Sequence, residues 1–236
     1  MQNSPMPSLP TLRPPAQPSV ADQVFDALQN SILTLHLPPH SKISETEVAG
    51  QMGVSRQPVR EAFKRLAKLG YLTIRPQSGT TVSPISEEAV ERARFIRTAL
   101  EVQTLRAACG KLGAEALKGL SDLLEAQKRA VTAGDREGFH NLDDAFHRMI
   151  CEETGVGFVW DMVLESKAHM DRIRLLSLNA SSRETALREH IDIYEAIAAN
   201  DPDRAADVIT SHLARITLHI EAVKAQDHRY FSRNRD

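Results

Sequence analysis

The stretch that decides the fold of this chain runs from Val54 to Leu66 and reads Val54-Ser55-Arg56-Gln57-Pro58-Val59-Arg60-Glu61-Ala62-Phe63-Lys64-Arg65-Leu66. Basic residues recur every four positions from Arg56 through Lys68, so they lie along one face of a helix. The apolar positions of the same helix are Val59, Phe63, Leu66 and Leu69. One face therefore packs in a core, while the other presents positive charge. We predict that this helix begins after Ser55 as its N-cap, continues to about Leu69 and is closed by Gly70.

The segments on either side predict the rest of a domain. Helical periodicity predicts helices over 19–35 and 45–52, and Ser44 is the expected N-cap of the second, with Glu47 as its capping-box partner. Gly53 ends that helix, and the short gap before the basic helix is typical of a helix-turn-helix. After Gly70, the segments 71–75 and 80–83 alternate like short strands joined through a turn at 76–79.

Three helices and a hairpin predict a winged helix-turn-helix over residues 19–84, in which the third helix enters the major groove of double-stranded DNA. Arg56 and Arg60 are the candidates for base contacts, because a guanidinium can bond both acceptors of a guanine. Candidates for phosphate and minor-groove contacts lie further along and on neighbouring elements: Lys64, Arg65, Lys68, Lys42, Thr46 and Ser78-Gly79-Thr80. The alternative is a basic solvated helix on an unrelated helical protein.

Composition sets wider bounds. The chain has 236 residues, 42% of them hydrophobic, which is enough for a buried core and two domains. Residues 1–18 are crowded with proline and predict a disordered tail. No apolar run is long enough to span a bilayer, and two cysteines are too few for a disulfide framework, so we expect a cytoplasmic protein without a membrane partner. The net charge of −2 hides a basic excess in residues 19–84, which is compatible with DNA binding.

Residues 85–226 read as helix throughout, so the whole chain is predicted to be mainly α. Six helices are expected, separated by short connections typical of an antiparallel all-helical bundle, and residues 227–236 are expected to form a C-terminal tail. The predicted helices are 87–109, 113–133, 136–153, 157–178, 183–199 and 203–225. This region contains no glycine-rich phosphate loop, serine nucleophile elbow or paired-cysteine motif.

Acids and histidines carry the chemistry of this bundle. Asp143 and His147 are four residues apart and share a helix face, while His190 and His212 lie among apolar positions of later helices. One carboxylate and three imidazoles meeting inside a bundle would suit zinc, nickel or another borderline divalent ion. A single histidine near an apolar face is more often a packed core residue, however, and His219 lies on nearly the same face as His212. Spacing does not choose between those two.

The basic helix and the wing segment after it resemble the signature of GntR-type bacterial transcription regulators. The matching residues are Val54 to Ala62, Leu66, Gly70-Tyr71-Leu72 and Gly79. The resemblance implies that Arg56 and Arg60 are the main DNA-contacting arginines and that Gly79 lies at the wing tip. Ser55, Gln57, Lys64 and Thr46 complete the predicted DNA-binding set. Gln57 stands where threonine is more usual, and Thr46 stands where some members of the FadR branch place an arginine that contacts DNA.

The second half resembles the FCD ligand-binding domain of the FadR branch. Metal-binding members of that group carry Asp-x-x-x-His on one helix and one histidine on each of the last two helices. The resemblance therefore implies a divalent metal ion, most often zinc, and leaves His219 out. The implied ligands are Asp143, His147, His190 and His212.

In such domains the metal lies at the floor of a pocket and helps to hold an organic acid effector. Arg97 and Arg172 are the predicted effector ligands, because a guanidinium and a divalent ion can clamp a carboxylate from two sides. The alternative is that both are ordinary arginines bridged to Glu101, Asp171 or a helix end. Val156 stands where the family often has asparagine, so the effector could be unusual.

Together these patterns predict a homodimeric transcription regulator, with repression relieved by effector favoured over activation. It would bind a palindromic operator and change its DNA affinity when a small carboxylate enters the bundle. Two alternatives stay open. The bundle could be a metal-dependent hydrolase or oxygenase fused to a DNA-binding module, or the metal ion itself could be the signal.

Overall fold

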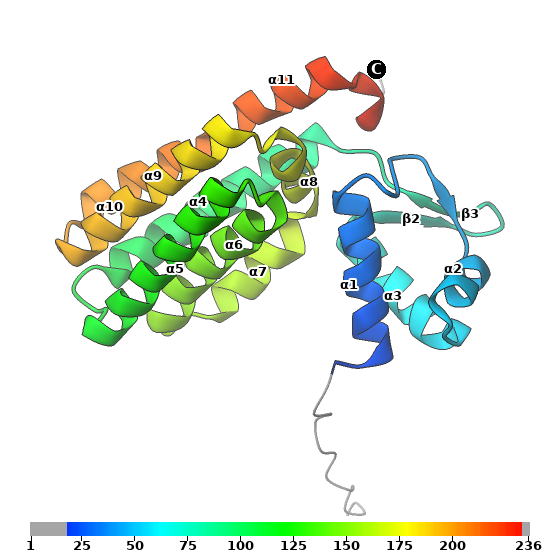
Figure 1. Cartoon of the computed structure of the whole chain (residues 1–236), viewed down its shortest axis with the longest axis horizontal. Coiled ribbons are helices and arrows are strands. Elements are labelled where there is room, and N and C mark those ends of the chain that lie inside the picture. The colour runs from blue at the N-terminus through cyan, green and yellow to red at the C-terminus, as the bar shows by residue number, and fades with distance from the viewer. Residues whose placement is uncertain (1–17, 233–236) are drawn as a thin grey trace, which may run out of the picture.

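The computed structural model describes residues 18–232 and shows two helical domains side by side (Figure 1). The predicted disordered tail therefore lies outside the described residues, apart from Pro18. The N-terminal domain has three helices, α1 (Val20–Leu33), α2 (Glu45–Met52) and α3 (Arg56–Lys68), and three short strands. The strands are β1 (Lys42–Ile43), β2 (Leu72–Arg75) and β3 (Gly79–Val82), and they form an antiparallel sheet in the order β1-β3-β2.

Strand β1 is a difference from the sequence prediction. Lys42 and Ile43 pair with Thr81 and Thr80, so Lys42, a candidate for a phosphate contact, lies on the wing sheet. Two residues are too short for an alternating pattern to show, and their pairing depends on partners almost forty positions away.

The local signals around α2 and α3 behave largely as predicted. The Ser44 side chain accepts a hydrogen bond from the Glu47 backbone N–H, and Gly53 ends α2 in the left-handed conformation at φ 66°. Ser55 is the N-cap of α3 by backbone position, but its side chain makes no capping hydrogen bond. Its hydroxyl is therefore free for another partner.

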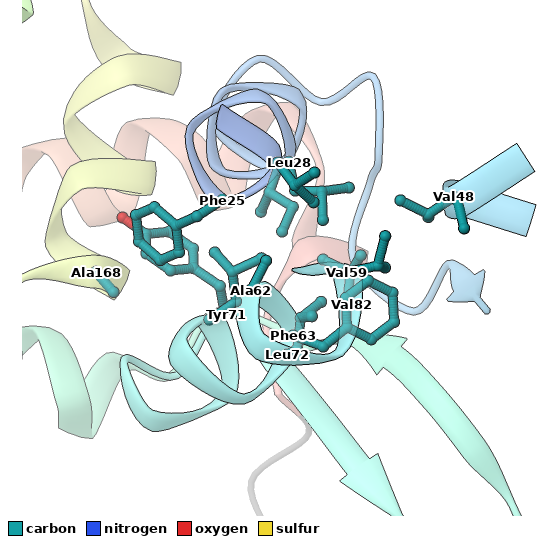
Figure 2. Packing of buried hydrophobic residues seen from close by; sticks show 14 residues of the cluster. Phe25, Leu28, Val48, Val59, Ala62, Phe63, Tyr71, Leu72, Val82 and Ala168 are labelled. Atoms are coloured by element: carbon teal, nitrogen blue, oxygen red, sulfur yellow. The ribbon is translucent and has the colours of Figure 1, made fainter. Parts of the chain in front are cut away.

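The core of this domain lies where α1 packs on α3 and the sheet. Leu28, Val59, Phe63 and Val82 are buried there (Figure 2). Figure 2 also shows Ala168, from a helix of the second domain, at the edge of the same cluster. The two domains therefore share part of one hydrophobic core.

The C-terminal domain is an antiparallel bundle with eight helices in the described residues, where the sequence predicted six. Its helices are α4 (Glu87–Ala108), α5 (Ala114–Ala133), α6 (Arg136–Glu153), α7 (Phe158–Ser166), α8 (Ala168–Ser177), α9 (Ala180–Ala198), α10 (Pro202–Ala214) and α11 (Ile216–Gln226). The single helices predicted over 157–178 and 203–225 are wrong. The chain breaks at Lys167 and at Arg215, and neither position has the glycine or proline that marks a helix end in sequence.

Residues 227–232, predicted as part of a tail, are structured. A short 3₁₀ helix covers His228–Tyr230, and Phe231 is 6% exposed and pairs with Ile85 in the connection between the domains. Ile85 donates its backbone N–H to Tyr230 O at 2.8 Å, and Ser232 donates to Ile85 O at 2.8 Å. Residues 233–236 lie outside the described part of the chain. Across residues 18–232 no helix has the length and apolar character needed to cross a membrane.

Candidate metal centre, cavity and DNA-binding surface

The four residues predicted as metal ligands come together inside the bundle. Asp143 and His147 project from α6, His190 from α9 and His212 from α10, and each offers a ligand atom within 4.8 Å of the others. Their side chains are 0%, 2%, 0% and 7% exposed, respectively. The centroids of the three imidazole rings are 4.9 to 5.4 Å apart. Residues from three helices thus converge on one point.

Each imidazole of this cluster is oriented by a hydrogen bond at its far nitrogen. His147 Nδ1 lies 2.7 Å from Glu101 Oε2, and His190 Nδ1 lies 2.7 Å from Gln127 Oε1. His212 Nδ1 lies 2.8 Å from Glu189 Oε2. Because all three partners are acceptors, Nδ1 is the donor in each ring, which leaves Nε2 as the nitrogen available to a metal. This is the outer-shell arrangement usual for metal-binding histidines.

Several buried polar atoms at the centre of the cluster have no hydrogen-bond partner within residues 18–232. Nε2 of His147, Nε2 of His190 and Oδ2 of Asp143 are all buried without a hydrogen bond. An unpaired buried polar atom is destabilising, and such atoms pointing at one another are best explained by a shared ligand. Three nitrogen donors and one oxygen donor form a set that suits zinc or another borderline divalent ion.

The ionisation of the cluster also suits a cation. Burial lowers the pKa of His190 well below its ordinary value and lowers that of His212. Burial alone would raise the pKa of Asp143, but Arg174 and the neighbouring histidines hold it well below its usual value. The two imidazoles are therefore neutral and the carboxylate is charged, which is the protonation state that a metal requires.

A second acidic group in the bundle contrasts with this cluster. His140, Asp144 and Asp171 also place donor atoms close together. The buried ammonium of Lys167 already lies between the two carboxylates, 2.7 Å from Asp144 Oδ2 and 2.8 Å from Asp171 Oδ2. A protein cation thus neutralises this group, which leaves the first cluster as the better metal site.

A cavity lies beside the cluster and shares His212 with it. Its polar lining consists of Arg97, Arg174, Ser177, Ser182, Glu189, His212, Arg215 and His219, and its apolar lining of Met170, Leu178, Ala186, Leu213 and Ile216. Arg97 is 1% exposed and donates from Nε to Glu101 at 2.6 Å, while its Nη2 has no hydrogen-bond partner among the described residues. A buried guanidinium with a free donor group is suited to an anionic ligand.

Arg172 is placed differently from the prediction. It does not line the cavity, and its Nη1 donates instead to the backbone oxygen of Ser83, at the end of the wing domain, at 2.6 Å. Arg174, two residues further along α8, lines the cavity and forms an ion pair with Asp143. Residues two apart on a helix lie on nearly opposite faces, so only one of these two arginines can face the bundle interior.

The predicted DNA-binding residues are exposed on the N-terminal domain. Five of them lie on α3 or just before it, one on α2 and one at the turn of the wing. They are Ser55, Arg56, Gln57, Arg60 and Lys64, then Thr46, then Gly79. Gly79 has φ 89°, a left-handed conformation that favours glycine at this turn. Two of the phosphate candidates have protein partners: Arg65 pairs with Asp22 at 2.6 Å, and Lys68 pairs with Glu165 of α7 at 2.6 Å.

Comparison with known proteins decides the family. Residues 20–82 match the model for bacterial regulatory proteins of the gntR family, and residues 93–215 match the FCD domain. The HTH-type transcriptional repressor RspR of Escherichia coli is 34% identical over 219 residues, which cover 92% of this chain and 96% of RspR. This chain belongs to the GntR family and carries an FCD domain.

Other members support the same assignment. A probable D-xylose utilization operon transcriptional repressor of Paenarthrobacter nicotinovorans is 32% identical over 203 residues, 83% of this chain and 86% of that protein. The solved structure of E. coli McbR/YncC has the same fold, with a TM-score of 0.75, 22% identity and coverage of 88% of this chain and all of that one. The predictions of a GntR-type DNA-binding regulator, and of a regulator rather than an enzyme, are confirmed by these relatives.

Sequence reasoning missed Gln127, Arg174 and the outer-shell roles of Glu101 and Glu189 in this GntR-family chain. A signal existed for Gln127, which continues the apolar helical spacing of Leu120 and Leu124 and is fully buried. A polar residue on an apolar stripe indicates a buried hydrogen-bond partner. No comparable signal marked Glu101 or Glu189, because each meets its histidine only in the folded bundle.

Proposed function

We propose that the protein is a homodimeric transcriptional repressor whose DNA affinity is controlled by a small organic acid bound beside a divalent metal ion. Zinc is the first choice for the ion, and nickel or another transition metal is the next. The observation that carries this proposal is the buried group of three oriented imidazoles and one carboxylate, Asp143, which adjoins an arginine-lined cavity. RspR and the Paenarthrobacter relative are both described as repressors, which favours repression.

The metal would be held by Asp143, His147, His190 and His212. When bound, it would supply a Lewis-acidic charge at the edge of the cavity, where a carboxylate oxygen of a ligand can approach it. Glu101, Gln127 and Glu189 would keep the three imidazoles in orientation through the hydrogen bonds at Nδ1.

The charges around the cavity favour a ligand with two acidic groups. The guanidinium groups are matched by carboxylates in the pairs Arg97–Glu101, Arg174–Asp143 and Arg215–Glu189. Burial lowers the pKa of His219 to about 4, so this residue adds no charge at neutral pH. A divalent ion would therefore leave the site with about two unbalanced positive charges, which a dicarboxylate neutralises. Arg97 keeps its predicted role in this proposal, and Arg174 replaces Arg172.

Helix α8 offers a route from this cavity to the DNA-binding domain. Arg174 reaches Asp143 from one side of the helix, while Arg172 binds Ser83 O on another side. Ala168 enters the core of the winged domain, and His169 Nδ1 accepts a hydrogen bond from the Ser86 backbone N–H at 3.3 Å. A ligand that draws Arg174 into the cavity would shift these contacts together and change how the winged domain is held.

Two copies would be needed to read a palindromic operator. The apolar side chains that would form this contact lie on α4 and α7, which pack against each other. Phe95 is 73% exposed, Phe158 63% and Met162 51%. Large exposed apolar side chains on adjacent helices mark an interaction site, and a second copy of the chain is the partner that a two-fold regulator requires.

The test begins with metal analysis of the purified protein and of two matched variants. We expect about one ion per chain in the wild type, none in His212→Ala and one in His219→Ala, because His219 lines the cavity but is not among the four clustered residues. Equal metal content in the wild type and in His212→Ala would overturn the metal assignment.

The second step is a thermal-shift panel of mono- and dicarboxylates of matched length, with and without a chelator. A ligand that binds only the folded state raises the melting temperature according to its concentration over its Kd. We expect dicarboxylates to give the larger shift, to lose it on chelation and to weaken DNA binding. DNA binding that follows free metal concentration, with no response to any carboxylate, would favour metal sensing instead.

A further inference from the structure

Glu45, the first residue of α2, contacts both of the arginines predicted to read DNA bases. Arg60 Nε lies 3.3 Å from Glu45 Oε1 and 3.2 Å from Oε2, and Arg60 Nη2 lies 3.2 Å from Oε2. Arg56 Nη2 reaches the same carboxylate at 3.4 Å. The two arginines are one helical turn apart on α3, so a single carboxylate on the neighbouring helix ties them together.

Stability does not explain this arrangement well. The side chains of Arg56, Arg60 and Glu45 are 59%, 47% and 26% exposed, and exposed ion pairs contribute little to folding. The carboxylate is nevertheless firmly ionised. Hydrogen bonding from Arg60 lowers the pKa of Glu45, and its position in the first turn of α2 favours negative charge through the helix dipole.

The geometry leaves part of each guanidinium available. Arg60 uses Nε and Nη2 on the carboxylate, so Nη1 and the second hydrogen of Nη2 have no partner in the part of the chain that the structure describes. Those donors at the end of the guanidinium are a pair that can bond O6 and N7 of a guanine together. A long arginine side chain that is already held in one orientation loses less freedom when it binds.

We propose that Glu45 is a specificity-determining positioning residue, which holds the Arg56 and Arg60 guanidinium groups for base contacts and opposes their use on phosphate. This inference rests on the proposed base contacts of Arg56 and Arg60. The Glu45 carboxylate repels the phosphates of the DNA backbone, which weakens non-specific binding. A correctly placed guanine, in contrast, accepts hydrogen bonds from guanidinium groups that are already aligned.

The test compares Glu45→Gln with Glu47→Gln in the full-length protein. Glu47 is exposed on the same short helix and makes no ion pair within residues 18–232, so both variants remove one negative charge near the DNA. A preferred duplex is first selected from a random-sequence pool with the wild type. Affinities for that duplex and for an unrelated duplex of equal length are then measured at two salt concentrations.

We expect Glu45→Gln to reduce the ratio of preferred to unrelated affinity by about tenfold, and Glu47→Gln to leave the ratio unchanged while raising both affinities slightly. Equal ratios in the two variants would overturn the proposal and make Glu45 a simple repelling charge. A melting temperature close to that of the wild type shows that Glu45→Gln is folded.

A second comparison separates this proposal from the one it rests on. In an Arg56→Ala/Arg60→Ala background, adding Glu45→Gln should have no further effect on the affinity ratio, because Glu45 acts through those arginines. A further tenfold loss there would mean that Glu45 contacts a base itself, which overturns the positioning role. If the double arginine variant keeps full specificity, the base contacts of Arg56 and Arg60 are wrong, whatever Glu45 does.

Discussion

Gln127 is the residue whose replacement tests the metal centre most directly without touching a proposed ligand. It is fully buried on α5, its Oε1 lies 2.7 Å from His190 Nδ1, and its Nε2 donates to Leu142 O at 3.1 Å. Gln127→Leu keeps the volume roughly constant and removes both hydrogen bonds. His190 would then lose the acceptor that keeps the proton on Nδ1 and leaves Nε2 free for a metal.

The expected loss can be worked out from these two bonds. Losing an outer-shell partner weakens metal binding by about 10- to 100-fold, which is about 1.4 to 2.7 kcal/mol. The buried His190 N–H is also left unpaired, at a cost of about 1 to 3 kcal/mol in folding stability, while the Leu142 carbonyl keeps its backbone bond within α6 and loses only its second donor. Metal affinity is measured by competition with a chromogenic chelator, and stability by urea unfolding of the metal-free protein.

Two further variants separate the effect on the metal from the effect on folding. Gln103→Leu, at an exposed position of α4, should change neither quantity. Gln127→Glu keeps an acceptor for His190 but loses the donor to Leu142 O, so metal affinity should be retained while the metal-free protein is destabilised. If Gln127→Leu lowers stability but binds metal as tightly as the wild type, the reasoning about the outer shell is refuted.

Three other predictions concern the contacts between the domains. Burial lowers the pKa of His169 to about 4 from 6.5, so the unfolded chain takes up the proton first and stability falls as the pH drops from about 6.5 to 4. Other buried histidines add their own losses, so the measured quantity is the difference in unfolding free energy between the wild type and His169→Gln, from urea unfolding at each pH. This difference should shift by about 2 kcal/mol against the wild type between pH 7.5 and 5, and a pH-independent difference would contradict the prediction. Arg172→Leu removes the donor to Ser83 O. We expect the metal content and the thermal shift caused by the ligand to stay unchanged, while the effect of the ligand on DNA affinity becomes several-fold smaller. An unchanged effect on DNA affinity would argue against α8 as the route between the two sites. Phe231→Ala should destabilise the protein by about 3 kcal/mol in urea unfolding, because the ring is buried beside Ile85. A loss below about 1 kcal/mol would show that the segment 227–232 does not pack against the domain connection in solution.

The winged domain could be predicted closely because its boundaries are set by local chemistry. Ser44 caps α2, Gly53 ends it with a left-handed residue, and the four-residue spacing of basic side chains marks the exposed face of α3. Each signal acts within a few residues of its own position, so a sequence pattern is enough to find it. Strand β1 escaped prediction because its two residues depend on a partner in the wing.

The helix break at Lys167 has no local signal and is set by tertiary contacts. Lys167 is buried and its ammonium is bonded to Asp144 of α6 and Asp171 of α8. Those contacts involve residues up to 23 positions away, and a propensity argument does not see them. The choice between Arg172 and Arg174 likewise depends on packing that the sequence does not show: Arg174 lines the cavity, while Arg172 turns to Ser83 O.

The choice between His212 and His219 shows how such a break affects a functional site. On one continuous helix, residues seven apart share a face, so spacing alone leaves both as candidates for one position. The break at Arg215 lies between them and puts His212 on α10 and His219 on α11. Glu189 then reaches Nδ1 of His212 at 2.8 Å and turns its Nε2 toward the cluster, while His219 is left to line the cavity. An acceptor on a neighbouring helix, Glu189, thus distinguishes two histidines that look equivalent in sequence: His212 joins the proposed metal cluster and His219 lines the cavity. The metal contents of His212→Ala and His219→Ala measure that division directly.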